Sequence, residues 1–305
     1  MSDVKPEGVY GTLPPELADA PEEAIQFSPL VPGAEALEDR AEGSLSALSA
    51  LAPPGTLERR YALALALRAV APGGRLTVLA PKDKGGSRLG KELKGFGCAV
   101  SETSRRHHRI CVCERPAHPS GIGEALAAGG PQFDETQGLW TQPGVFSWNR
   151  IDPGSALLLE HLPALSGRGA DFGCGIGSLA RPVLASAGVA ALAMIDIDRR
   201  AIAAARRNVE DSRASFLWRD VRQARDLPHG LDFVVMNPPF HDGGIEDRAL
   251  GESFIRRAAE SLRPGGSLWL TANRHLPYEA PLKASFKRVA LKVEAGGYKV
   301  YEAHR

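Results

Sequence analysis

Short apolar segments alternate with helix-forming segments through the second half of this chain, and this alternation limits the folds that the chain can adopt. We expect strands over 170–172, 189–196, 214–219, 231–236 and 267–271, and helices over 177–187, 199–209 and 249–262. Asp198 directly precedes the second helix and is a good N-cap. The pattern predicts a Rossmann-like, doubly wound α/β sheet that binds ligands at the carboxyl ends of its strands.

The first half carries an imperfect copy of one part of this pattern. The segment at 67–81, LRAVAPGGRLTVLAP, resembles the segment at 260–272, ESLRPGGSLWLTA. In each, a helical run is followed by Pro-Gly-Gly, which ends the helix, and then by a short apolar strand. Two more strands are expected after each copy, at 95–100 and 109–115 and again at 288–294 and 298–304. The two halves are therefore expected to share one α/β plan.

Charge is distributed unevenly along the 305 residues, although the whole chain carries a formal net charge of only +1. Residues 1–58 hold two Lys/Arg and eleven Asp/Glu, a net charge of −9. Residues 59–115 hold thirteen basic and four acidic residues, a net charge of +9, and are densest at 105–109 (RRHHR). This basic segment could hold an RNA backbone, and a solvated surface is the plain alternative.

The remaining composition is that of a globular cytoplasmic protein, with 43% hydrophobic and 24% charged residues. No apolar run approaches the ~18 residues that span a membrane, and the first residues lack the pattern of a signal peptide. Four cysteines in a chain of this length do not form a disulfide scaffold, which fits a reducing compartment.

His107, His108, Cys111 and Cys113 lie close together and invite comparison with a zinc site. Zinc-binding cysteine pairs usually have about two to four residues between them, whereas a single residue separates this pair. Because the cysteines alternate with apolar residues, the segment is better interpreted as a strand, and no metal site is expected.

Residues 117–150 are rich in Gly, Pro and Gln and are expected to join two domains, with the later part ordered as a loop. The predicted organisation is an N-terminal domain at 1–116, a linker at 117–140 and a C-terminal domain at 141–305.

The first candidate site is the glycine loop Asp171-Phe172-Gly173-Cys174-Gly175-Ile176-Gly177, directly after a predicted strand. Glycines let the backbone turn sharply and approach a ligand closely. The Gly-x-Gly-x-Gly spacing differs from the dinucleotide fingerprint, and the acid in front would repel a pyrophosphate. Such an acid suits a cationic ligand that carries an ammonium and a sulfonium group. The predicted cofactor-binding residues here are Asp171, Gly173, Gly175 and Gly177.

Acidic residues end the next two predicted strands. Asp196 lies 19 residues after Gly177, where a carboxylate can accept both hydroxyls of a ribose. Asp198 competes for this role, but its position fits the helix cap better. Asp220 could receive the amine of an adenine ring, or it could simply cap a turn.

The third candidate site is Asn237-Pro238-Pro239-Phe240, after the central strand. Two prolines stiffen the loop and remove two N–H donors. The Asn237 side-chain oxygen and the Pro238 carbonyl are then two convergent acceptors for an NH₂ group, and Phe240 can stack on a planar ring. The predicted catalytic residues are Asn237, Pro238 and Phe240, and Asn237 is also predicted to bind the cofactor.

These motifs together resemble the class I S-adenosylmethionine-dependent methyltransferases. Further segments narrow the resemblance to bacterial ribosomal-RNA guanine-N2 methyltransferases of the RsmC/RlmG type. They are NPPFHDG at 237–243, PGVFS at 143–147, IDPGSALLL at 151–159, ANRHLPY at 272–278 and YKVY at 298–301. The resemblance is strong over about 140–305, weaker over 59–115 and poor before that.

The resemblance implies two tandem methyltransferase-like domains, of which only the second binds S-adenosylmethionine. The first half lacks the glycine loop and the Asn-Pro-Pro motif, and APPG at 52–55 looks like a decayed counterpart with Ala in place of Asn. The implied reaction is methylation of guanine N2 in ribosomal RNA, and the expected substrate is the 16S rRNA of the small subunit. Pro239, Phe240, His241 and Phe146 are then expected to bind the substrate.

Other functions remain open on the sequence. The same tetrapeptide would serve methylation of adenine N6 in nucleic acid or of glutamine N5 in a protein. A ribosome-assembly factor that binds RNA without catalysis is a third possibility. A nicotinamide oxidoreductase fits the glycine spacing poorly.

Overall fold

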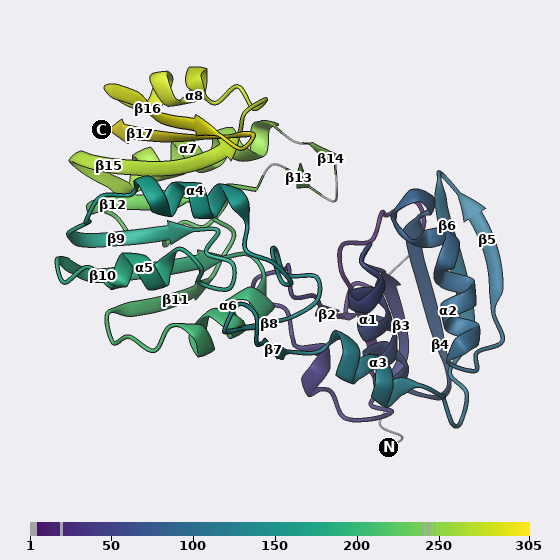
Figure 1. The fold of residues 1–305 in the computed structure, drawn as a ribbon. Helices are drawn as coiled ribbons and strands as arrows, with labels where there is room; N and C mark the ends of the chain where they lie inside the picture. Colours follow the sequence, from purple (N-terminus) through teal and green to yellow (C-terminus); the bar gives the residue numbers. More distant parts are fainter. Residues whose placement is uncertain (1–4, 19–20, 240, 243–244, 247) are drawn as a thin grey trace. The chain divides into compact units, whose positions relative to one another are not determined.

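A computed structural model describes residues 5–18, 21–239, 241–242, 245–246 and 248–305 (Figure 1). The chain divides into two compact units, Met1–Pro131 with Gln142–Gly144 and Gln132–Thr141 with Val145–Arg305. We call them the first and the second unit. Each is built around its own sheet with helices, so the chain has the mixed α/β fold that the sequence predicts.

The second unit contains a seven-stranded sheet in the order β11-β10-β9-β12-β15-β17-β16. Neighbouring strands run parallel except around β17, which is antiparallel to both β15 and β16. This is the class I methyltransferase fold. The strands are β9 (Gly167–Phe172), β10 (Val189–Asp196), β11 (Ala214–Trp218), β12 (Leu231–Met236), β15 (Leu262–Asn273), β16 (Arg288–Ala295) and β17 (Tyr298–His304).

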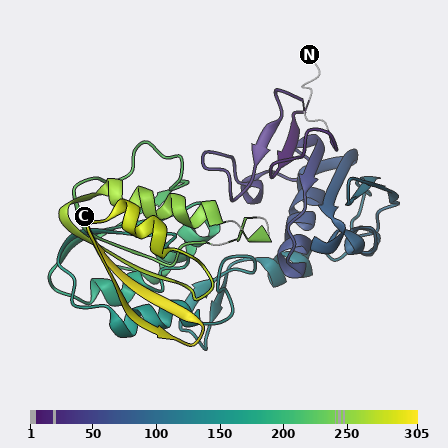
Figure 2. The same cartoon turned by 90° about the horizontal axis from the view of Figure 1, so that it is seen from above.

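Helices cover both faces of this sheet (Figures 1 and 2). Alternate residues of β12 point to opposite faces, so Val234 packs in the cluster with α7 and α8, and Val235 packs in the cluster with α4, α5 and α6. Burial on both faces explains why this strand is apolar nearly throughout. The helices are α4 (Pro153–His161), α5 (Ala180–Leu184), α6 (Arg199–Asn208), α7 (Arg248–Ser261) and α8 (Glu279–Ser285).

The first unit repeats most of this topology in a six-stranded sheet, β2-β1-β3-β4-β6-β5. Its β6 is antiparallel to both neighbours, as β17 is in the second unit. The order matches β10-β9-β12-β15-β17-β16, with no strand in the place of β11 among the described residues. The strands are β1 (Glu7–Tyr10), β2 (Ile25–Phe27), β3 (Leu45–Leu51), β4 (Val70–Pro81), β5 (Ser101–Arg105) and β6 (His108–Glu114).

The repeated Pro-Gly-Gly segments occupy equivalent places in the two sheets. They lie inside β4 and β15 rather than before a strand, which corrects the expectation from the sequence. The pairing shifts register at the same point in both, from Val70 to Arg75 in β4 and from Leu262 to Ser267 in β15. A side chain at the last glycine of either copy would meet a carbonyl oxygen of the neighbouring strand, so glycine is required there.

The shorter elements and the remaining helices complete the two units. In the first unit they are α1 (Thr56–Ala69), α2 (Leu89–Gly95), α3 (Ile122–Gly129), η1 (Leu37–Asp39), η2 (Lys82–Lys84) and η3 (Gly86–Arg88). In the second unit they are the hairpins β7 (Gln132–Asp134) with β8 (Leu139–Thr141), and β13 (His241–Asp242) with β14 (Ile245–Glu246). None of the described helices is long and apolar enough to cross a membrane.

Three expectations about individual elements are wrong. Residues 95–100 do not form a strand. Helix α2 ends at Gly95, and the strand that follows is β5 at Ser101–Arg105, whose residues are polar and exposed. Helix α5 covers only Ala180–Leu184 of the expected 177–187, and Gly177, with a φ of +91°, is not in a right-handed helical conformation. The segment 117–140 is folded rather than linker-like: α3 packs against Tyr61 of α1, and β7 and β8 belong to the second unit.

The strand interpretation of the His-Cys segment is confirmed. Cys111 and Cys113 lie on β6 with their side chains buried, and Val112 between them is partly exposed. All four cysteines are buried and free.

Candidate active site

The carboxyl ends of β9, β10 and β12 meet at one edge of the second sheet, because β9 is paired with both neighbours. Phe172 lies opposite Met236 on one side and Ile195 on the other. Gly173 and Asn237 directly follow β9 and β12, and Asp196 is the last residue of β10, so the three lie at the same edge. A Cβ atom on Gly173 would lie 4.0 Å from the Asn237 carbonyl oxygen. The glycine loop and the Asn-Pro-Pro loop are thus neighbours, as the sequence predicts.

The glycine loop needs glycine at three positions. Gly173, Gly175 and Gly177 have φ values of +74°, +53° and +91°, in the region that side chains disfavour. A Cβ on Gly177 would lie 3.0 Å from Val209, so this glycine lets the loop pack against the end of α6. A Cβ on Gly175 would meet nothing within 4 Å. Gly175 therefore presents bare backbone to open space, which suits close approach by a ligand.

Asp171 is a buried carboxylate at the end of β9, next to this loop. Its side chain is fully buried, and neither oxygen has a hydrogen-bond partner within the described chain. Burial, with the nearby charge of Asp196, raises the pKa of Asp171 to about 8. A buried acid without partners needs a donor or a cation to complete it. A ligand that carries an ammonium group would meet that need, directly or through water.

Asp196 and Asp198 have different roles, and Asp198 is the helix cap, as the sequence predicts. Asp198 caps α6 by accepting a hydrogen bond from the Arg200 backbone N–H at 2.9 Å and pairs with the Arg200 guanidinium. Asp196 ends β10 and accepts from the backbone N–H groups of Gly175 and Asp198, both at 2.8 Å. Burial raises the pKa of Asp196 to about 6. Each oxygen keeps a lone pair that a ribose hydroxyl can use.

Asp220 is engaged locally, and its contact with adenine remains a prediction. Its carboxylate accepts from the Arg222 backbone N–H at 2.9 Å and forms an ion pair with the Arg222 guanidinium at 2.9 Å. These contacts are those of an acid that caps a turn, the alternative that the sequence left open.

The Asn237 amide is held in one orientation. Its Nδ2 donates to Asp152 Oδ2 at 2.7 Å and to Ser155 Oγ at 3.0 Å. Because both amide protons are used in this way, Oδ1 is the atom left to accept a hydrogen bond from a substrate. Pro238 is buried and Pro239 is exposed. Phe240 lies outside the described residues, and only the backbone is described for His241, so their predicted roles remain predictions.

Asp152 and Ser155 are site residues that the sequence analysis did not single out. Asp152 is the N-cap of α4 and accepts from the Ser155 backbone N–H at 2.7 Å, with Pro153 at the first helical position. The Asp-Pro-Gly-Ser sequence is a recognisable helix start. It gives no sign that the same carboxylate reaches Asn237, 85 residues away. Tyr298 lies nearby, and burial together with the charge of Asp152 raises the pKa of its phenol.

Phe146 is 57% exposed, in the segment between the buried Val145 and α4. The next residue, Ser147, has a φ of +56°, one of three positive values found for non-glycine residues in the described chain. The substrate contact of this exposed ring remains a prediction.

In the first unit, APPG follows β3 and precedes α1, the place that Asn-Pro-Pro occupies after β12. The carbonyls of Pro53 and Pro54 accept hydrogen bonds from the Arg59 guanidinium at 3.3 and 2.6 Å. Arg59 is buried and is balanced by Glu92 at 2.7 Å. The acceptors of this loop are therefore occupied from within the protein, and Ala52 supplies no side-chain oxygen.

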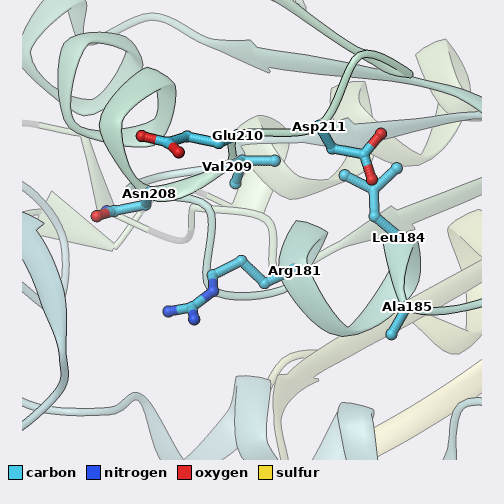
Figure 3. A pocket seen from close by; sticks show the side chains of 7 residues that line it. All are labelled: Arg181, Leu184, Ala185, Asn208, Val209, Glu210 and Asp211. Carbon is cyan, nitrogen blue, oxygen red and sulfur yellow. The ribbon is translucent and has the colours of Figure 1, made fainter.

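A pocket of about 260 Å³ lies elsewhere in the second unit, around the last turns of α5 and α6 (Figure 3). Arg181, Asn208 and Asp211 are among its lining residues. None of the predicted site residues lines it, so we do not assign it to catalysis.

Comparison with known proteins identifies the class of this site. Residues 136–302 match the family described as Methyltransferase small domain. The ribosomal RNA small subunit methyltransferase C of Pseudomonas paraeruginosa is 35% identical over 93% of this chain and 86% of its own length. The chain belongs to this family. The protein of that name from Hahella chejuensis is 33% identical over 81% of this chain and 75% of its own length.

A solved member of the family has the same fold over almost the whole chain. The 16S rRNA N2 methyltransferase of T. thermophilus, in complex with AdoMet and guanosine, gives a TM-score of 0.79 with 25% identity, over 98% of this chain and 88% of its own. The chain is thus a methyltransferase that uses S-adenosylmethionine, and both predictions are confirmed. The bare Gly175 backbone and the orphaned Asp171 carboxylate fit this cofactor.

Proposed function

We propose that this protein methylates the exocyclic N2 amine of a guanine in ribosomal RNA, in the small subunit. The observation that carries the proposal is the fixed Asn237 amide, which leaves Oδ1 as an acceptor on a residue whose backbone neighbours the glycine loop. The relatives support the substrate class, because they are named for the small-subunit RNA. The T. thermophilus protein supports the base and atom, because it is a 16S rRNA N2 methyltransferase in complex with AdoMet and guanosine.

Guanine N2 is a poor nucleophile because its lone pair is delocalised into the ring. Two acceptors, Asn237 Oδ1 and the Pro238 carbonyl, can hold both N–H bonds and favour a pyramidal nitrogen. The same acceptors stabilise the positive charge that builds on N2 in the transition state. Fixing the reacting atoms in line can supply ~7–11 kcal/mol of the barrier reduction. The stiffness of the loop is therefore part of the proposed catalysis.

The cofactor, when bound, supplies a methyl group on a sulfonium, from which a neutral thioether is a good leaving group. The N2 lone pair forms the new N–C bond as the C–S bond breaks, which leaves a neutral thioether and a methylated, cationic arylamine. This amine loses one proton to water, and the product is neutral N2-methylguanine. No strong base is required, and Asn237 and Pro238 act as hydrogen-bond acceptors and not as bases.

The remaining assignments follow the same proposal. The residues proposed to contact the cofactor are Asp171, Gly173, Gly175, Gly177, Asp196 and Asp220. Those proposed to contact the base are Pro239, Phe240, His241 and Phe146. A paired guanine must leave its stack before it can reach Asn237. We place catalysis in residues 141–305 and an RNA-binding role in the degenerate domain at 1–116.

The test is transfer of a labelled methyl group to ribosomal subunits from a strain that lacks its own enzyme for this site. The expected result is label in 16S RNA, recovered by nucleoside analysis as N2-methylguanosine. N6-methyladenosine in the RNA, or N5-methylglutamine in a protein fraction, would support the alternative acceptors. Cofactor binding by calorimetry without transfer to any subunit would contradict the proposal.

A further inference from the structure

The hairpin of β5 and β6 in the first unit closes through a turn with an unusual sequence. Arg105 pairs with His108 across the hairpin, so Arg106 and His107 are the two turn residues. Their φ values are +45° and +60°. A two-residue hairpin turn with two positive φ values is of type I′, for which Asn-Gly is strongly preferred. Arginine therefore occupies a position that favours quite different residues, whereas histidine is one of the side chains found more often at positive φ.

Stability of the turn does not explain this choice. A residue with a side chain pays a conformational cost in the left-handed region, and glycine pays almost none. The buried core does not explain it either, because Arg106 is 62% exposed and all five residues of β5 are exposed. An inference from strain to function is reasonable where the strained side chains share a chemical property. Here that property is the capacity for positive charge.

Further cations lie beside the turn. The Lys82 backbone N–H donates to the His107 carbonyl at 2.9 Å, which places η2 against the hairpin. We call this group the basic tip, and its members are Lys82, Arg105, Arg106 and His107. Two acids accompany the three Lys/Arg: Asp83 within η2, and Glu16, which forms an ion pair with Arg106 at 2.7 Å. Glu16 is itself 41% exposed, so this pair is open to competition by an external anion.

Other basic residues of the segment are committed to contacts within the first unit. Arg59 is buried against Glu92, and Arg115 pairs with Glu42 at 2.5 Å. Arg109 and Lys94 both reach Glu102. Part of the positive charge in residues 59–115 therefore serves contacts within the first unit. The basic tip is the part of it that combines exposure with strained turn geometry.

We propose that the basic tip binds the phosphodiester backbone of the ribosomal RNA substrate, with a phosphate replacing Glu16 as the partner of Arg106. This inference rests on the proposed function for its choice of polyanion. Guanidinium groups bind phosphate oxygens in a fork geometry, and such contacts add affinity that falls steeply with salt.

The chain offers a variant that separates binding from folding. Arg106→Asn with His107→Gly supplies the preferred type I′ residues and removes one full charge. We expect it to melt at the same temperature as the wild type or higher. Its affinity for a 16S rRNA transcript, measured by filter binding, should fall roughly fivefold in low salt, and the slope of log K against log salt should decrease by about one.

Two matched variants complete the test. Glu16→Gln removes the competing acid and should strengthen binding. Arg256→Gln removes an arginine of similar exposure, 64%, from α7 in the second unit and should leave the slope unchanged. Wild-type affinity and slope in the turn variant would overturn the inference. So would an equal loss in the Arg256→Gln control.

Methylation distinguishes this inference from the proposed function. If the wild type methylates guanine N2 in the subunit while the turn variant binds RNA normally, only the role of the basic tip is lost. If neither the wild type nor any variant methylates RNA, the proposed function fails, whatever the transcript-binding data show.

Discussion

The Asn237 side chain donates a hydrogen bond to the carboxylate of Asp152 at 2.7 Å, and that carboxylate also caps helix α4. The start of one helix thus sets the orientation of an amide at the end of the central strand. Acceptance by a carboxylate fixes which end of the amide is nitrogen, since Asp152 has no proton to donate when ionised. Asp152 and Ser155 are in this sense positioning residues for Asn237.

Replacing Asp152 by Ser separates its two roles. Serine keeps a good N-cap, so the free energy of unfolding should change by less than about 1 kcal/mol. It is too short to hold the Asn237 amide as the carboxylate does. The turnover number should fall by about tenfold to a hundredfold, because hydrogen bonds to charged groups contribute about 1.5–3 kcal/mol.

Steady-state kinetics and calorimetry check this prediction. A positioning role lowers the turnover number and leaves the dissociation constant of the cofactor unchanged. Ser155→Ala removes only the weaker acceptor and should have a smaller effect in the same direction. A loss confined to the melting temperature would show that Asp152 serves only the helix.

The buried Asp171 predicts a specific pH dependence. Its pKa of about 8 lies above the ordinary value of 3.8, so the folded protein holds a proton that the unfolded chain releases. The stability of the cofactor-free protein should therefore fall as the pH rises from about 4 to about 8. A cationic cofactor favours the carboxylate, so its affinity should rise over the upper part of the same range.

Asp171→Asn should remove both trends above about pH 6, whereas the fall in stability below that pH should persist because Asp196, with a pKa of about 6, also titrates there. The variant should be more stable than the wild type above pH 8, because no charge is buried, and it should bind the cofactor more weakly at that pH. Melting curves and calorimetry between pH 5 and pH 9 measure both quantities. Asp211→Asn is the control, since ion pairing with Arg213 lowers the pKa of Asp211 to about 2, outside this range.

Phe146→Ala tests whether the exposed ring contacts a ligand. The side chain is 57% exposed, so its loss should change the free energy of unfolding by no more than about 0.5 kcal/mol. If it stacks on the guanine, the KM for the subunit should rise several-fold, and stacking losses of about 1–3 kcal/mol per base are typical. An unchanged KM for both substrates would remove Phe146 from the site.

The buried ion pair of Arg59 and Glu92 should be essential to the stability of the first unit. Arg59→Ala leaves Glu92 unpaired and frees the Pro53 and Pro54 carbonyls, so unfolding should become easier by about 3–5 kcal/mol. Chemical denaturation measures this loss. Replacing both residues by apolar ones of similar size should recover much of it, because no buried charge then remains uncompensated.

The elements predicted correctly from sequence are those with a strong local signal. β10 and β12 have the predicted bounds because apolar runs mark strands that are buried on both faces. Asp198 caps α6 because capping depends on neighbouring residues alone. β5 was missed because its residues are polar and exposed at the edge of the sheet, where burial imposes no alternation.

The site was predictable to a similar limit. Motifs at strand ends placed Gly173, Asp196 and Asn237 at one sheet edge, because parallel topology brings strand ends together. Contacts between distant segments were out of reach of any local pattern. The hold of Asp152 on Asn237 and the occupation of the Pro53 and Pro54 carbonyls by Arg59 are both of this kind.

The most direct test of the central claim is the single-turnover rate of methyl transfer to small subunits by Asn237→Ala, with cofactor saturating. We predict a loss of about a hundredfold or more, with cofactor affinity within about threefold of the wild type, because one transition-state acceptor is removed. The residual product should still be N2-methylguanosine. Full transfer by Asn237→Ala would contradict the claim that this amide holds the guanine amine.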